Sequence, residues 1–393
     1  MNKKIILESF LATILVFLVL WILFLSINIS FKPFNYVVKS IKQINLNDLY
    51  FSKIENNSID TNIIIINTEN LKRKGISDVL NKVNDGNPAV IGLDIFFYVE
   101  NNTPNDSLLL STLHNLKDKL VMSNIYSDDG VINYDYWYFD EIKNGHSGIL
   151  TNKNGTDVVR EFEPKIYNNY GSVNSFSTEI VARFDADAAN NLKQRNNKKE
   201  TINYIGGTNA FRVINYKNLL RYSNTELGFL KNKIVMVGFC GGNTINTADL
   251  RDIYYTPVGF EIASNRPPDM YGIIIHANIV SMIIKESYIN HSPNWIVYLI
   301  TIILTFLYVT LFTYFYVVKH LYFHIAAKLI QLVTFILILW IVFLIFSNYQ
   351  LTIPTKYLLV SVILSVDVLY LYEALAVMLY KKYKIKSIFV HDH

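Results

Sequence analysis

Four long apolar segments constrain this chain more than any other feature of its sequence, and they lie at residues 5–27, 295–318, 329–346 and 357–380. A helix over the first segment would extend about 34 Å, enough to cross a hydrocarbon core of about 30 Å. We therefore predict four transmembrane α-helices. The first segment exceeds the usual signal-peptide core of about 7–15 residues and lacks a small-residue cleavage pattern, so we expect an uncleaved anchor.

The lysines near the ends of these segments predict the orientation of the chain. The positive-inside rule places residues 1–4, 319–328 and 381–393 in the cytoplasm, and 347–356 and the large domain 28–294 outside it. We therefore expect a multi-pass protein of the bacterial inner (cytoplasmic) membrane, with its large domain in the periplasm. The lysines that carry this prediction are Lys3, Lys4, Lys319, Lys328, Lys381, Lys382, Lys384 and Lys386.

Composition excludes several classes of protein. Hydrophobic residues make up 51% and charged residues 17% of the chain, which is too apolar for an ordinary soluble enzyme. The net charge is only +4, and no dense run of Lys or Arg supports nucleic-acid binding. The single cysteine, Cys240, excludes an internal disulfide and a four-thiolate zinc site. We predict no cofactor and no metal.

The domain 28–294 shows an α/β pattern. Residues 62–71 and 89–97 contain continuous apolar runs typical of strands buried on both faces, and a helix pattern at 76–83 separates them. Such a strand–helix–strand unit predicts a layered α/β domain with a mainly parallel central sheet and antiparallel additions. Further expected elements are strands at 119–126, 202–206 and 234–238, helices at 106–119 and 175–184, and an exposed loop at 185–200.

Residues 231–285 connect the domain to the membrane. The strand at 234–238 is followed by Gly241 and Gly242, which we interpret as close backbone packing because no phosphate-binding motif accompanies them. A second apolar run at 273–275 precedes a helix that we expect to begin at His276. That helix ends about ten residues before the next apolar segment. It is therefore the covalent path by which the membrane part would respond to the domain.

Several of these segments together resemble a known family. NIIIINTENL, VIGLDIFF, INYIGG, DIYYTPVG and GIIIHANIVSMIIKESYI resemble the type 2 CHASE domain, a bacterial extracellular sensory module, over roughly residues 40–290. The resemblance implies one span before the sensor and usually three after it, followed by a kinase or cyclase. The sequence ends at His393 without such a domain, so we expect the output to be separately encoded. Where the family often has an acidic residue, this chain has Asn67.

Four polar residues of the domain are candidates for ligand binding. Asp94 ends a predicted strand, where α/β sheets commonly bind ligands, although a capping role is equally compatible. Asp249 and Asp252 flank Arg251 and could recognise a small ligand or a cation, or form a local salt bridge. His276 could be a ligand contact, or a structural residue at the start of its helix.

Catalysis finds little support in the sequence. His146 and Ser147 are adjacent, but adjacency alone does not make a catalytic dyad. The sequence shows no convincing pair of catalytic carboxylates, metal-binding cluster or nucleophile elbow. We predict that the chain is not an enzyme.

Asp367 lies within the last apolar segment, where an ionised carboxylate is costly unless it is paired. With no Lys or Arg expected at its depth, two interpretations remain. A neutral Asp367 could be hydrogen-bonded within the bundle, or it could contact another membrane protein or a second copy of the chain. Glu373 is expected to pair with Lys328.

These observations favour a membrane-anchored sensor. We expect its outer domain to detect an envelope or small-molecule signal and to pass it to a separately encoded protein partner. The resemblance also leaves a homodimer open. The alternative from another class is a non-enzymatic scaffold subunit of an envelope complex.

Overall fold

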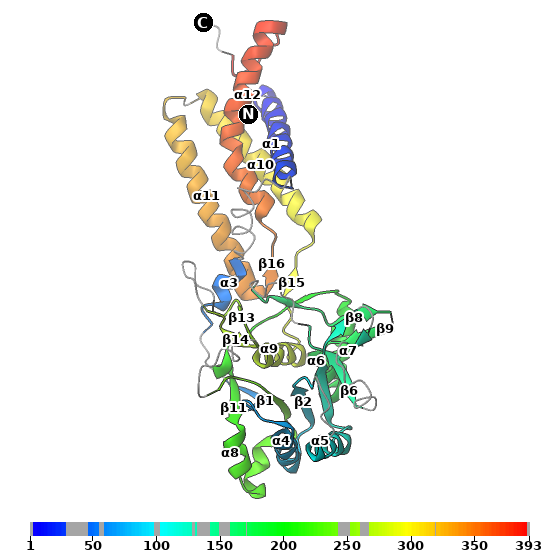
Figure 1. Cartoon of the computed structure of the whole chain (residues 1–393). Coiled ribbons are helices and arrows are strands. Elements are labelled where there is room, and N and C mark those ends of the chain that lie inside the picture. The colour runs from blue at the N-terminus through cyan, green and yellow to red at the C-terminus, as the bar shows by residue number, and fades with distance from the viewer. Residues whose placement is uncertain are drawn as a thin grey trace. The chain divides into compact units, whose positions relative to one another are not determined.

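The computed structural model describes residues 3–28, 46–54, 59–97, 103–127, 130–131, 142–148, 158–169, 171–242, 252–259, 267–318 and 320–390. Its contacts divide the chain into two compact units (Figure 1). The helical unit comprises Met1–Asn47 and Asn290–His393, and the α/β unit comprises Asp48–Ile289.

A six-stranded parallel sheet forms the centre of the α/β unit, in the order β11-β1-β12-β2-β3-β6. The strands β1, β2, β3 and β12 are continuous apolar runs, and both of their faces are covered, as expected for parallel strands. The predicted α/β class with a mainly parallel central sheet is therefore confirmed. The strands are β1 (Asp60–Asn67), β2 (Val90–Asp94), β3 (Leu120–Asn124), β6 (Lys143–His146), β11 (Phe211–Asn215) and β12 (Ile234–Gly238).

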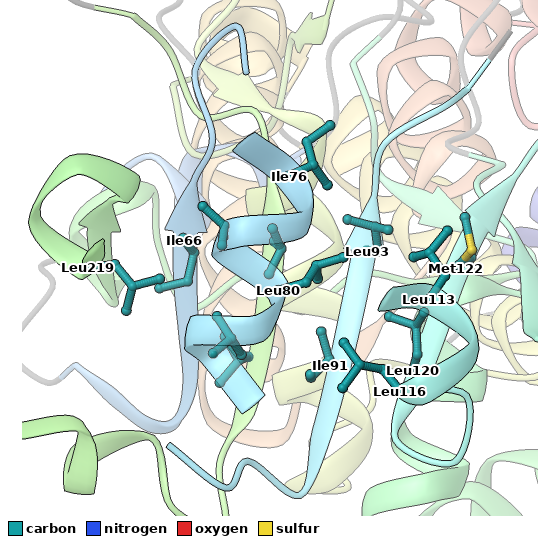
Figure 2. Packing of buried hydrophobic residues seen from close by; sticks show 14 of the residues in the cluster. Ile66, Ile76, Leu80, Ile91, Leu93, Leu113, Leu116, Leu120, Met122 and Leu219 are labelled. Carbon is teal, nitrogen blue, oxygen red and sulfur yellow. The ribbon is translucent and has the colours of Figure 1, made fainter. Parts of the chain in front are cut away.

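Helices cover both faces of this sheet (Figure 1). One face carries α4 (Arg73–Asp85), α5 (Pro104–Asn115) and α8 (Tyr216–Arg221). Figure 2 shows how side chains from these helices and from alternate strand positions interlock, with Leu80 between Ile66 and Leu93. The opposite face carries α6 (Phe176–Phe184), α7 (Ala186–Arg195) and α9 (Gly272–Ile284).

Among the described residues, four short antiparallel pairs are added to this core, in agreement with the predicted antiparallel additions. They carry few residues and leave the central sheet entirely parallel. The pairs are β4 (Tyr126–Ser127) with β5 (Gly130–Val131), β7 (Glu161–Phe162) with β10 (Glu200–Thr201), β8 (Lys165–Asn168) with β9 (Gly171–Asn174), and β13 (Ile253–Tyr254) with β14 (Met270–Tyr271).

The prediction of an exposed loop at 185–200 is wrong, because most of this segment forms helix α7. Asp185 caps this helix by accepting hydrogen bonds from the backbone N–H groups of Asp187 and Ala188. Ala188, Ala189 and Leu192 are buried on one face. The abundance of Asn and Lys on the exposed face concealed this short apolar stripe.

Two other expectations need correction. Residues 202–206 do not form a central strand, because the backbone N–H groups of Asn203 and Ile205 donate to side chains of α9, at Met282 and Asn278. Strand β11 takes the edge position beside β1, whose other neighbour is β12. Helix α9 begins at Gly272, so the apolar run at 273–275 is its first turn and not a separate element.

The helical unit contains the four predicted apolar helices, each long and apolar enough to cross a membrane. Two short strands, β15 (Asn290–His291) and β16 (Leu351–Thr352), pair in parallel just before α10 and just before α12. Asn47, in the short helix α3 (Leu46–Phe51), donates a hydrogen bond of 3.0 Å to Thr352. The long helices are α1 (Lys3–Asn28), α10 (Asn294–Val318), α11 (His320–Tyr349) and α12 (Lys356–Tyr383).

Close packing of α6 on the sheet generates a prediction about Gly145. A Cβ atom there would lie 2.5 Å from the Cα of Phe176, whereas a Cβ on Gly228 would meet nothing within 4 Å. We expect Gly145→Ala to lower the free energy of unfolding by about 1–3 kcal/mol, because backbone must move to admit the methyl group. Thermal unfolding of the full chain in detergent measures this. Gly228→Ala is the matched control, and an equal effect of both changes would contradict the packing.

Candidate functional site

Polar residues meet where the central strands end. Asn67, Gly238 and Asp94 are partners in register at the carboxyl ends of β1, β12 and β2. Their neighbours Ile66 and Leu93 point into the core beneath α4 and α5. Because side chains alternate along a strand, Asn67 and Asp94 face the side covered by α9. This edge of a parallel sheet is where α/β domains most often bind ligands.

Asp252 adds a second carboxylate to this edge. It lies against the start of α9, since a Cβ on Gly272 would come within 2.7 Å of its Oδ1 atom. The Tyr254 hydroxyl donates a hydrogen bond to the Asp252 carboxylate. Burial, together with the negative charge of Asp94, raises the pKa of Asp252 to about 7. The Asp252 side chain therefore exchanges its proton near neutral pH.

His276 lies on α9 beside these carboxylates. The Ser177 hydroxyl of α6 is 3.0 Å from its Nδ1 atom, and the ring of Phe176 packs edge-on at 5.2 Å. Burial lowers the pKa of His276, although the charge of Asp94 opposes this effect. The ring is therefore neutral near pH 7 and leaves the two carboxylates without a positive charge from α9.

The loop after β12 is fixed by Asn67. Its Nδ2 donates to the Gly241 carbonyl at 2.8 Å, and its Oδ1 accepts from the backbone N–H of Cys240 at 3.0 Å. Gly241 has a φ of 89°, and a Cβ there would lie 2.7 Å from the Tyr271 hydroxyl. The prediction of close backbone packing at this turn is thus confirmed for Gly241. An aspartate at position 67 could not donate to that carbonyl.

Cys240 and His146 border the site without forming a catalytic pair. Burial raises the pKa of the Cys240 thiol to about 12, so it stays protonated and poorly nucleophilic. Burial and the nearby His276 lower the pKa of His146 to about 4. Its Nδ1 atom accepts a hydrogen bond from the Gly148 backbone, and no hydrogen bond joins its ring to the Ser147 hydroxyl.

The structure brings together three of the four candidate residues, Asp94, Asp252 and His276. Asp249 lies outside the described residues. Sequence reasoning missed Tyr254, which stands in the DIYYTPVG segment two residues after Asp252. Within the described part of the chain, neither Asp94 nor Asp252 forms a salt bridge, and no three His, Cys, Asp or Glu residues are grouped to hold a metal ion. The arrangement suits a proton or a small cationic group.

Comparison with protein families matches residues 12–313 to the CHASE2 domain. The chain belongs to the CHASE2 domain family. The match covers the first span from residue 12 onward, the α/β unit and most of α10. No curated protein matches the chain, and no solved structure does. CHASE2 is an extracellular sensory domain, not a catalytic one, and with four candidate spans it fits a membrane sensor.

Outside the CHASE2 α/β unit, Asp367 has a partner that the sequence did not predict. Lys328 Nζ lies 2.8 Å from Asp367 Oδ1, and both side chains are 56% exposed on the surface of the helical unit. The expected pair of Lys328 with Glu373 is wrong, and Glu373 instead accepts a hydrogen bond from Tyr316. The relative position of α11 and α12 along their axes places Lys328 beside Asp367. The same position lets the Gln331 side chain donate a hydrogen bond to the Val362 carbonyl.

The raised pKa of Asp252 predicts how stability depends on pH. Its pKa of about 7 exceeds the ordinary 3.8, so the folded CHASE2 domain binds this proton more tightly than the unfolded chain. The contribution of Asp252 to the free energy of unfolding should therefore fall as pH rises through the interval between these two values, and then level off. The lowered pKa values of His146 and His276 contribute a rise over part of the same interval, so the effect of Asp252 is read from the difference between the wild type and the variant. Asp252→Asn should remove that fall and stabilise the protein on the alkaline side by about 1 kcal/mol or more.

Denaturant unfolding at several pH values across that interval measures the effect. Asp78→Asn, which removes an exposed carboxylate on α4, is the control and should keep the wild-type slope. An unchanged slope in Asp252→Asn would contradict the assignment.

The contacts of Asn67 predict that Asn67→Asp is destabilising. The change removes the donor to the Gly241 carbonyl and places a carboxylate beside backbone oxygens, at a cost of about 1–3 kcal/mol. Thermal unfolding of the full chain provides the measurement. Asn232→Asp is the control, because Asn232 is exposed with a φ of 58° that aspartate also tolerates. Equal stability of Asn67→Asp and the wild type would refute this role.

Proposed function

We propose that this CHASE2 protein is a signalling sensor of the bacterial inner membrane. Its α/β unit lies in the periplasm and detects a small-molecule or envelope signal at the site formed by Asp94, Asp252 and His276. A separately encoded protein reads the resulting change in the membrane. The observation that carries the proposal is the pair of carboxylates at the start of α9, the helix that continues toward the membrane spans.

Helix α9 is suited to transfer a change at the site. It is buried from Gly272 to Ile283, so it packs as one rigid body. Its first residue, Gly272, lies against Asp252, its second turn carries His276, and its last turn is held by Asp60. Asp60 accepts hydrogen bonds from Ser281 at 2.7 Å and from Lys285 at 2.6 Å. A proton or cation at the carboxylates therefore acts on the helix that leads out of the domain.

A shift of the segment that follows α9 would reach several membrane helices at once. Residues 285–293 connect α9 to α10. Within the helical unit, β15 at the end of this connection pairs with β16, which precedes α12. A shift of β15 would therefore move the connection between α11 and α12 as well as the start of α10.

The output surface proposed for the partner is the face around the Lys328–Asp367 pair. An ion pair with both side chains half exposed is costly in hydrocarbon, and a protein partner would shield it from lipid. Ile363 and Leu371 lie one turn before and one turn after Asp367, and their side chains are 48% and 45% exposed. Together these residues form one face of α12.

Photo-crosslinking from this face tests the proposal. A photoreactive residue at Ile363 or Leu371 should capture a signalling protein in membranes of the native host, identified by mass spectrometry. The same residue at Val366, which is fully buried in the bundle, is the matched control and should capture only the chain itself. Capture of a periplasmic structural protein in fixed stoichiometry would instead identify a scaffold. Equal capture from all three positions would contradict the proposed face.

A further inference from the structure

A second cleft of the α/β unit lies apart from the carboxylate site. Its volume is about 850 Å³, and it opens between the β8–β9 hairpin and the C-terminal part of α7. The floor includes Thr178 and Leu192, which are 1% and 3% exposed. Helix α6 borders both sites, since Thr178 lines the cleft while the preceding Ser177 contacts His276.

The chemistry of the cleft is basic and rich in hydrogen-bonding groups. Lys165, Lys193 and Lys198 line it against a single carboxylate, that of Glu163. Among the described residues, Lys193 and Lys198 form no salt bridge. Their ammonium groups are therefore available to an anion.

Neutral groups complete the lining. Four asparagines line the cleft, and the side-chain nitrogens of Asn174 and Asn197 already donate hydrogen bonds to Glu179 and Glu200. Tyr167 is 76% exposed beside Lys165, whose Nζ lies 5.2 Å from the centroid of the Tyr167 ring. Amides suit hydroxyl groups, and an exposed aromatic ring can stack on the apolar face of a sugar. The asparagines are Asn168, Asn174, Asn196 and Asn197.

The helix that forms one wall of the cleft is also bonded to the exit of the domain. Asn191 of α7 donates a hydrogen bond of 2.7 Å to Glu286, just after α9. The Arg195 guanidinium lies 4.3 Å from the centroid of the Tyr288 ring. Glu286 has a φ of 50°, a conformation that is uncommon for glutamate, so this segment depends on its contacts. A ligand that presses on α7 would change the support of residues 286–288.

We propose that this cleft binds a small acidic sugar, meaning a hydroxyl-rich ligand with one phosphate or carboxylate group. The anionic group pairs with Lys193 and Lys198, the hydroxyl groups bond to the asparagines, and Tyr167 stacks on the ring. The proposal deepens the sensory role proposed above, because α7 carries the change to the exit of the domain.

Isothermal titration calorimetry of the full chain in detergent tests the cleft directly, with glucose 6-phosphate and glucuronic acid as acidic probes. We expect at least one of the two to bind. Neutral glucose and inorganic phosphate should each bind about tenfold more weakly than that probe. Glucose lacks the anionic group that pairs with the lysines, and phosphate lacks the sugar ring and its hydroxyl groups. The double variant Lys193→Gln/Lys198→Gln should weaken binding of the acidic sugar by about tenfold or more.

Lys231→Gln, at an exposed position outside the cleft, is the matched control and should leave affinity unchanged. Failure of both acidic sugars to bind, or unchanged affinity in the double variant, would overturn the proposal. Inorganic phosphate that binds as tightly as the sugar phosphate would overturn the sugar assignment. Because the readout is binding alone, such a failure is distinguishable from failure of the membrane output, which crosslinking from α12 reports.

Discussion

The burial of α9 is the constraint on which the α/β unit depends. An apolar helix that is enclosed on all sides could slide or rotate if its contacts were apolar alone. Here His276 meets Ser177, Asn278 bonds the backbone of residues 205 and 206, and Ser281 bonds Asp60. Any displacement would unpair several buried polar groups at about 1–3 kcal/mol each. The helix therefore has one well-defined position. Its first residue lies against Asp252, and its last turn leads into the segment that precedes α10.

Under the proposed function, that arrangement would let a change of charge at the site act at a distance. The carboxylates of Asp94 and Asp252 lie beside a neutral His276, so a proton or cation changes the charge next to α9. At the other end of α9, the exit segment is held by polar contacts to Asp60, Asn191 and Asn203. The contact between Asn191 and Glu286 is exposed, so it can be exchanged for hydrogen bonds to water with little change in free energy, unlike the buried pairing of Asp60.

The sequence predicted those parts of the fold that depend on local pattern. Continuous apolar runs predicted the parallel strands, and the position of Asp94 at the end of one predicted a site there. The proximity of Asp94 to Asp252 depends on the pairing of β13 with β14 beside the start of α9. The spacing of residues along the chain does not reveal this pairing. Likewise, the pairing of Lys328 with Asp367 depends on the stagger between two antiparallel helices. Helix α7 was missed because its polar composition outweighed three buried residues.

The most direct test of the account is amide hydrogen exchange across residues 272–289 of the full chain, on both sides of the Asp252 pKa of about 7. Exchange reports local opening, so it follows the fit of α9 and its exit segment. After correction for intrinsic rates, the wild type should show a change of protection that extends from Gly272 to the exit segment, and Asp252→Asn should show none. The same change in both proteins, or a change confined to the first turn of α9, would contradict the claim that α9 connects the site to the membrane helices.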